Sequence, residues 1–227
     1  MIRREDNIAW LYINGEERLC TRNLAKGGVY GERIIVYEGE EYRVWDPFRS
    51  KLAAIIIKGL KNMPIKRGTS VLYLGASTGT TVSHISDIVE DGIVFAVEPA
   101  VRVARELLEK VVKKRKNVIP IIEDARKALY HSIFGKVDVV YCDIAQPDQT
   151  EIALMNCKNY LKEEGYLMLV IKSRSIDVTK EPKDVINEEI SKLRMFEISE
   201  SINLEPFDKD HAMVIARYSS RSSKNIL

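Results

Sequence analysis

A lysine and an aspartate each follow an apolar run in the second half of the chain, and together they could activate a hydroxyl group. Asp143 follows the run VDVVYC, and Lys172 follows the run YLMLVI. A lysine at the end of a hydrophobic strand is partly desolvated, which favours its neutral form, and a nearby carboxylate can orient it. Because hydroxyl groups are weak nucleophiles, a transfer reaction on a hydroxyl needs such a base. Lys172 is therefore the candidate general base.

A glycine turn and several acids follow the apolar runs and could bind a cofactor that contains a nucleoside. GASTGTT, at positions 75–81, separates an apolar run from a helical pattern and lets a ligand approach the backbone. Glu98 follows the next run and could accept hydrogen bonds from both hydroxyls of a ribose. Asp124 and Asp143 follow the two runs after that. Each acid taken singly could instead be a helix N-cap.

The spacing of the glycine turn indicates the kind of cofactor. Gly-x-x-x-Gly differs from the GxGxxG of NAD-binding proteins, and the lysine of a phosphate-binding loop is missing. A nucleotide phosphate is therefore disfavoured, and with it an NAD-dependent oxidoreductase. The acids at one edge suit a positively charged adenosyl sulfonium.

From position 68 onward, apolar runs of four to eight residues alternate with helical stretches. This alternation is typical of a parallel sheet covered on both faces, and it predicts a doubly wound, Rossmann-like α/β fold with seven strands. Adjacent strands would place Asp143 and Lys172 at the same edge. The expected strands are 71–74, 93–97, 118–122, 137–141, 166–171, 196–202 and 212–216, and the expected helices are 81–88, 102–114, 125–131, 149–160 and 185–193.

The first 48 residues have a different pattern, with short β-type runs at 8–13, 33–38 and 41–44. Turn residues at Asn14-Gly15, Gly27-Gly28 and 38–40 separate these runs, which predicts a small antiparallel β module. Ser50 then caps an amphipathic helix that ends near Gly59. We expect three parts: the module (1–50), the catalytic domain (51–218) and a polar, frayed tail (219–227).

Composition excludes several classes of protein. The 227 residues are 45% hydrophobic, enough for one domain with a small appendage. The 35 basic and 33 acidic residues leave a net charge of only +2, so an RNA substrate would need partners that help to hold it. The three cysteines lack metal-ligand spacing, which argues against a metal site or disulfides and favours the cytoplasm. No run is long enough to span a membrane.

Five stretches are similar to fibrillarin, a family of RNA ribose 2′-O-methyltransferases: WDPFRSKLAA, YLGASTGTTVSHISDIV, YCDIAQPDQ, VIKSRSID and DHAMVIARY. They occur in the same order and at similar spacing over nearly the whole chain. The resemblance implies a class I fold dependent on S-adenosyl-L-methionine, with a mostly parallel sheet whose last strand is antiparallel. It also implies a Lys-Asp-Lys-His tetrad around the target hydroxyl, at Lys51, Asp143, Lys172 and His211.

By the same resemblance, ten positions contact the cofactor: Gly75, Ala76, Thr80, Thr81, Glu98, Pro99, Asp124, Ala125, Asp143 and Gln146. Thr80 and Thr81 open a helix, where backbone N–H groups could bind the methionine carboxylate. Ser77 and Thr78 in the glycine loop depart from the family pattern. So does Pro99, which replaces an aromatic residue and could alter the stacking of the adenine.

The resemblance also implies a ribonucleoprotein particle. Its components are a C/D box guide RNA, a Nop-domain scaffold protein and a kink-turn-binding protein of the ribosomal type, and its substrates are rRNA and tRNA. The chain lacks the Gly/Arg-rich arm of eukaryotic members, which favours the archaeal form. A non-catalytic particle component and a methyltransferase for protein side chains or small molecules stay open as alternatives.

Two surface features have both a structural and a functional interpretation. The basic run at 110–116 either ends a helix or contacts RNA phosphates. The aromatic residues of the module either form its core or serve docking. They are Trp10, Tyr30, Tyr37, Tyr42 and Trp45.

Overall fold

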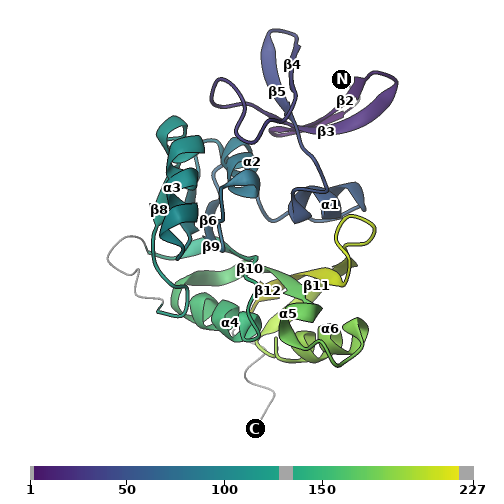
Figure 1. The fold of residues 1–227 in the computed structure, drawn as a ribbon, viewed down its shortest axis with the longest axis vertical. Helices are drawn as coiled ribbons and strands as arrows, with labels where there is room; N and C mark the ends of the chain where they lie inside the picture. Colours follow the sequence, from purple (N-terminus) through teal and green to yellow (C-terminus); the bar gives the residue numbers. More distant parts are fainter. Residues whose placement is uncertain (1–2, 128–134, 220–227) are drawn as a thin grey trace.

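A seven-stranded sheet forms the centre of the molecule in the computed structural model, which describes residues 3–127 and 135–219 (Figure 1). The strand order is β11-β12-β10-β9-β6-β7-β8. β12 runs antiparallel to β10 and β11, and the remaining pairs are parallel, which confirms the expected mostly parallel sheet. The strands are β6 (Ser70–Leu74), β7 (Ile93–Val97), β8 (Val118–Ile121), β9 (Val137–Cys142), β10 (Leu161–Lys172), β11 (Phe196–Asn203) and β12 (His211–Tyr218).

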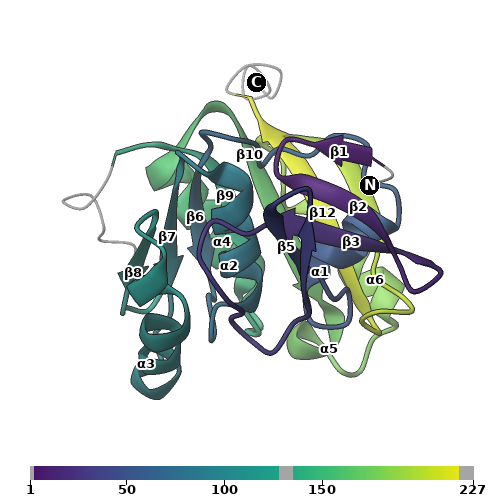
Figure 2. The ribbon, with the colours of Figure 1, turned by 90° about the horizontal axis from the view of Figure 1, so that it is seen from above.

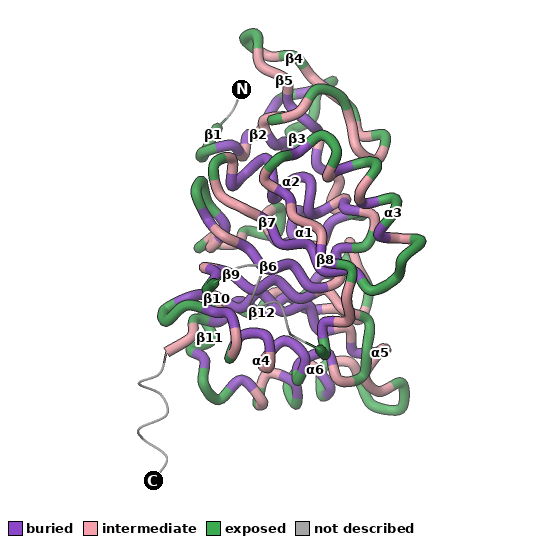
Figure 3. Tube along the Cα trace, turned by 90° about the vertical axis from the view of Figure 1, so that its left-hand side faces the viewer, coloured by how far each residue is buried: buried purple, intermediate pink, exposed green. Residues whose placement is uncertain are grey.

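Helices cover both faces of this sheet, as expected (Figure 1). The helices on one face are α1 (Lys51–Ile57), α2 (Thr80–Val89) and α3 (Val101–Lys110), and those on the other are α4 (Gln149–Tyr160), α5 (Ser173–Ile176) and α6 (Pro182–Ser191). Each face of the sheet has its own apolar core. In Figure 3, the strands between the two cores are mostly coloured as buried. Within the described part of the chain, no helix is long and apolar enough to cross a membrane.

Some expected boundaries need correction. β10 begins at Leu161, five residues before the apolar run, because the charged stretch up to Gly165 joins the strand through an irregular register. The expected helix 102–114 ends at Lys110 and continues as a 3-10 turn, Val112–Lys114. Of the expected helix 125–131, residues 125–127 form a turn and the rest lies outside the described residues. The expected frayed tail also lies outside them after Ser219.

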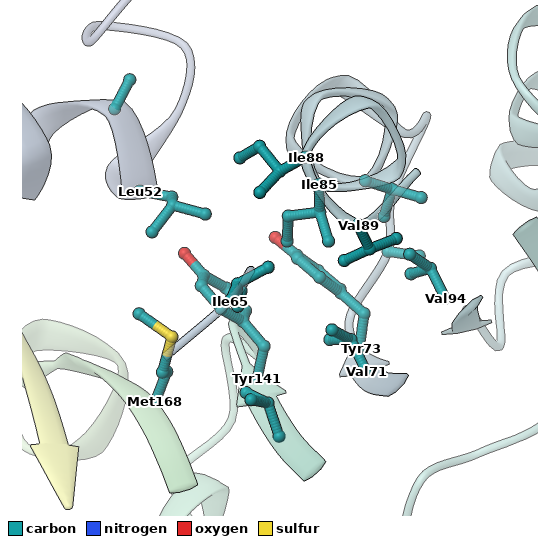
Figure 4. Packing of buried hydrophobic residues seen from close by; sticks show 14 of the residues in the cluster. Leu52, Ile65, Val71, Tyr73, Ile85, Ile88, Val89, Val94, Tyr141 and Met168 are labelled. Atoms are coloured by element: carbon teal, nitrogen blue, oxygen red, sulfur yellow. The ribbon is translucent and has the colours of Figure 1, made fainter. Parts of the chain in front are cut away.

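Two stacked tyrosines occupy the centre of the core below the candidate site. The rings of Tyr73 (β6) and Tyr141 (β9) are stacked, with centroids 4.5 Å apart and an angle of 14° between the ring planes. Figure 4 shows them between Leu52 of α1 and Ile85 of α2, with both hydroxyls pointing toward these helices. Burial raises the pKa of both phenols well above the ordinary value, so both stay neutral. The pair ties the two central strands to the helices above them.

The N-terminal residues form a separate five-stranded antiparallel sheet, with the order β1-β2-β3-β5-β4. Its hairpins turn at Asn14-Gly15 and Glu38-Gly39, where all four residues have positive φ, as the turn residues predict. The sequence did not reveal β1 or β3, because RRE and EERLCTR are mostly charged and lack apolar alternation. The strands are β1 (Arg3–Glu5), β2 (Ile8–Ile13), β3 (Glu16–Arg22), β4 (Ile34–Tyr37) and β5 (Glu40–Val44).

A buried polar cluster joins this sheet to α2. Arg43 of β5 donates to Asp87 at 2.7 Å and to Ser83 at 2.8 Å, and the side chains of Arg43 and Asp87 are fully buried. Arg115 also pairs with Asp87. Buried ion pairs of this kind are costly to break singly, because the remaining charge is left without a partner. The N-terminal sheet is thus fixed over α1 and α2 (Figure 2).

His84 is the titratable group in this cluster that should make stability depend on pH. Its ring contacts Thr21 Oγ1 at 2.7 Å and Tyr30 Oη at 2.8 Å and stacks on Trp45. Burial, and then the charges of Arg43 and Arg115, lower the pKa of His84 well below its ordinary value. There is therefore a pH range in which the His84 ring is neutral in the folded chain but protonated in the unfolded chain.

We expect the free energy of unfolding to fall by up to about 1.4 kcal/mol per pH unit as the pH drops below about 6.5, where the unfolded His84 binds a proton. Denaturant titrations between about pH 7.5 and 5 should show this slope in the wild type and a smaller one in His84→Gln, since all other titrating groups are shared. Parallel curves for the two proteins would contradict the assignment.

Candidate active site

The four residues of the expected tetrad come from four elements that meet at one edge of the large sheet. Asp143 follows β9, Lys172 ends β10, and His211 begins β12. Lys172 and His211 are register partners, because β12 is antiparallel to β10 and starts where β10 ends. Lys51 is the first residue of α1, which packs above this edge. The topology therefore brings together residues that are far apart in the sequence.

Asp143 lies at the centre of this group. Its carboxylate oxygen Oδ1 is 2.8 Å from Lys172 Nζ and 3.3 Å from Lys51 Nζ. Lys172 Nζ also donates to the Asp143 backbone carbonyl at 3.0 Å. All three side chains are largely buried, at 13 to 21% exposure, so water screens these charges weakly. The expected role of Lys172 as a base stays a prediction.

The position of Lys51 depends on the cap of α1. The hydroxyl of Ser50 accepts from the Ala53 backbone N–H, as expected for an N-cap, and lies 3.0 Å from Thr81 Oγ1. Thr81 is buried in the first turn of α2, and its hydroxyl contacts Ser50. No sequence pattern indicated this contact, which fixes the start of α1 against the start of α2.

Asp208, in the turn before β12, is a further charged residue of the site that was not predicted from the sequence. Its carboxylate is 3.4 Å from Lys51 Nζ and 3.1 Å from His211 Nδ1. Burial disfavours the Lys51 ammonium, but Asp143 and Asp208 outweigh this effect and raise the pKa of Lys51 above its ordinary value. The available signal was an acid three residues before the histidine, in DKDH.

A cavity of about 320 Å³ lies beside the tetrad, at the lower end of the range for small-molecule sites, roughly 300–1,000 Å³. Lys172 and Asp143 line it, so the cavity and the tetrad are continuous. Ala76, Thr80 and Thr81 do not line it, and their cofactor contacts stay predictions. The predicted cofactor residues that line it are Gly75, Glu98, Pro99, Asp124, Ala125, Asp143 and Gln146.

The side chains of the cavity fit an adenosyl ligand. The carboxylate of Glu98 accepts from the backbone N–H of Ser77 at 2.9 Å and of Ala100 at 3.0 Å, so it is held in one orientation. Both its oxygens keep lone pairs that ribose hydroxyls could reach. At Gly75, with φ +84°, a Cβ would lie 2.7 Å from the carbonyl oxygen of Asp143, so glycine lets the loop lie close against the backbone of Asp143.

Asp124 and Arg126 also line the cavity. Asp124 Oδ1 accepts from the Arg126 backbone N–H at 2.9 Å, which is the contact of an Asx turn. The Arg126 guanidinium contacts Gln146 at 3.0 Å and Asp148 at 2.8 Å. Arg126 was not predicted, because one arginine in a turn carries no sequence signal. It links the two loops that hold Asp124 and Gln146.

The sequence model of the family described as "Fibrillarin" matches residues 2–220. The chain belongs to the fibrillarin family. A fibrillarin-like rRNA/tRNA 2′-O-methyltransferase of Saccharolobus islandicus is 57% identical over 212 residues, 91% of each chain. The structure of Aeropyrum pernix fibrillarin with natively bound S-adenosyl-L-methionine has a TM-score of 0.86 at 46% identity and covers 92% of this chain and 94% of its own. A fibrillarin/Nop5p complex has a TM-score of 0.82 at 41% identity and covers 94% and 98%.

The remaining features of this fibrillarin-family chain mostly have structural explanations. In the basic run, Lys110 and Lys113 pair with Glu106 and Glu109 on the same helical segment, and Arg115 is buried. Tyr42 and Trp45 are 1% exposed and belong to the core of the molecule. Neither feature therefore needs an RNA or a partner to account for it.

Proposed function

We propose that this chain transfers a methyl group from S-adenosyl-L-methionine to the ribose 2′-hydroxyl of rRNA and tRNA. The observation that carries the proposal is the convergence of Lys51, Asp143 and Lys172 at a cavity that fits the cofactor, with His211 beside Lys172 on the adjacent strand. The natively bound cofactor of the Aeropyrum protein and the name of the Saccharolobus relative support it.

In this proposal, Glu98 binds the ribose of the cofactor, and the backbone around Gly75 lies against it. The bound cofactor supplies an activated methyl group on a sulfonium, so the chain itself must orient the hydroxyl and manage its proton and charge. Asp143 holds the ammonium groups of Lys51 and Lys172 at the edge of the cavity. There they can stabilise negative charge that develops on the 2′-oxygen.

We propose further that the chain acts within a particle in the cytoplasm, directed by a C/D box guide RNA. A net charge of +2 gives the chain little general attraction for RNA, so binding partners must hold the substrate. The fibrillarin/Nop5p complex supports a Nop-domain scaffold as one partner. The kink-turn-binding protein follows from the resemblance alone. The cytoplasm is favoured by three buried cysteines that are all free thiols.

The test is methyl transfer from labelled cofactor to guide-matched RNA in the assembled particle, with a 2′-hydroxyl or a 2′-deoxy nucleotide at the target. We expect label only on the 2′-hydroxyl RNA. Label on both RNAs would indicate a base as acceptor, and label on protein would indicate a side chain. Absence of transfer despite measured cofactor binding would indicate a non-catalytic component.

A further inference from the structure

The turn before β12 carries a carboxylate to which the tetrad assigns no role. The backbone N–H groups of Phe207 and Asp208 both donate to the Leu204 carbonyl, at 2.9 and 3.2 Å, which fixes the turn. One oxygen of Asp208 contacts His211 and the other contacts Lys51. Asp208 therefore connects the first and last members of the tetrad.

The contacts of His211 determine which ring nitrogen carries the hydrogen. Nδ1 lies 2.6 Å from the Lys209 carbonyl oxygen and 3.1 Å from Asp208 Oδ1. The backbone carbonyl can only accept a hydrogen bond, and so can a carboxylate, so Nδ1 carries a hydrogen in the singly protonated ring. The lone pair is then on Nε2. No hydrogen bond from residues 3–127 or 135–219 occupies this atom.

The charged groups around His211 come from three other elements. Lys172 faces it across the β10–β12 pair, Lys51 approaches from α1 through Asp208, and Asp143 lies between the two lysines. Asp143 contacts both lysines, and Asp208 contacts Lys51 as well. Among the four tetrad side chains, His211 thus has a ring nitrogen, Nε2, that makes no hydrogen bond within the described part of the chain.

We propose that Asp208 is a positioning residue that holds His211 with Nδ1 protonated, so that Nε2 accepts the proton of the RNA 2′-hydroxyl. This inference rests on the proposed function. In the step, the O2′–H bond breaks and the proton moves to Nε2, while a lone pair of O2′ forms the bond to the methyl carbon. The S–CH₃ bond breaks, and its electron pair stays on sulfur.

Asp208 contributes in two ways to this step. Its carboxylate orients the ring before the reaction and stabilises the imidazolium afterwards, as an acid behind a catalytic histidine does. Lys172 then stabilises the negative charge on O2′ and does not accept the proton. The same carboxylate holds Lys51, so the histidine and this lysine keep a fixed relation.

Kinetics in the assembled particle test the proposal with Asp208→Asn, Asp208→Glu and the control Asp210→Asn. Asp210 lies in the same turn, but its carboxylate accepts from Arg174 Nε at 3.3 Å and does not contact His211. We expect D208N to lower kcat by about a hundredfold, with KM for cofactor and RNA within about threefold. D208E should recover at least about tenfold of the loss, and D210N should stay within about threefold of wild type.

Nitrogen NMR of the full chain labelled at histidine gives a second measurement that needs no RNA. The sequence has three histidines, and His211→Gln identifies the signals of His211. We expect a protonated Nδ1 and a bare Nε2 in the wild type. An Nε2-protonated ring, unchanged kcat in D208N, or no recovery in D208E would overturn the proposal. Absence of transfer by the wild-type particle would instead refute the proposed function, and the NMR result would still stand.

Discussion

Replacing Lys172 with methionine should lower the rate of methyl transfer by about a thousandfold while leaving cofactor affinity within about threefold. Methionine keeps most of the length of the side chain and removes only the ammonium. That ammonium is 2.8 Å from the Asp143 carboxylate, at the edge of the cavity. A preorganised positive charge in a site with little water stabilises the transition state far more than the ground state. The loss should therefore appear in kcat and not in binding.

Lys162→Met is the matched control for this prediction. Lys162 lies near the opposite end of β10 and also forms an ion pair, with Asp138 at 2.6 Å, but its side chain is 47% exposed. Its removal should leave transfer within about twofold, because exposed ion pairs contribute little. Single-turnover assays with labelled cofactor, together with calorimetric titration of the cofactor, measure both quantities. A Lys172→Met variant that retained wild-type turnover would remove this residue from the mechanism.

Gly75→Ala should impair both halves of the site at once. A Cβ at this position would lie 2.7 Å from the carbonyl oxygen and 3.1 Å from the carbonyl carbon of Asp143, both backbone atoms that cannot turn away. The substitution must displace either the glycine loop or Asp143. Because a shift of about 1 Å in catalytic geometry can cost about a hundredfold, we expect at least that loss in kcat/KM. Cofactor affinity should also weaken, by about tenfold or more.

Gly15→Ala separates the steric effect from backbone strain. Gly15 has a similar positive φ, +88°, yet a Cβ there would meet nothing within 4 Å. Gly15→Ala should lose about 1–2 kcal/mol of stability, since an L-residue is strained in this conformation, and Gly75→Ala should lose at least as much. Only Gly75→Ala should lose activity and cofactor binding. Equal activity losses in the two variants would show that strain, and not contact with Asp143, is responsible.

The large sheet and part of the site were predictable from local pattern. Apolar runs separated by helical stretches indicate parallel strands, and adjacent parallel strands place Asp143 and Lys172 together at their carboxyl ends. His211 follows no such rule. Its place depends on β12 running antiparallel, which the family resemblance implied and the β10–β12 register confirms.

Other parts of the site depend on tertiary contacts that leave no periodic signal. Asp208 reaches both Lys51 and His211 because a turn at Leu204 brings it to the edge of the sheet. The hydroxyl of Thr81 contacts Ser50 through the packing of two helix starts. β3 was not predicted because four of its seven residues are charged, although Leu19, Cys20 and Thr21 are buried in the folded chain. Such contacts are set by long-range packing, which short-range patterns do not encode.

The fully buried pair of Arg43 and Asp87 changes how the change of architecture near residue 50 should be understood. The chain forms one sheet before this point and another after it. The ion pair nevertheless joins the small sheet to a helix that covers the large one. A fragment beginning at Lys51 would keep every strand of the large sheet. It would still leave the carboxylate of Asp87, in α2, without its partner Arg43. Dividing the chain at this point would therefore produce two incomplete parts. A partner that binds the small sheet would, through this connection, also position the edge of the large sheet that carries the site.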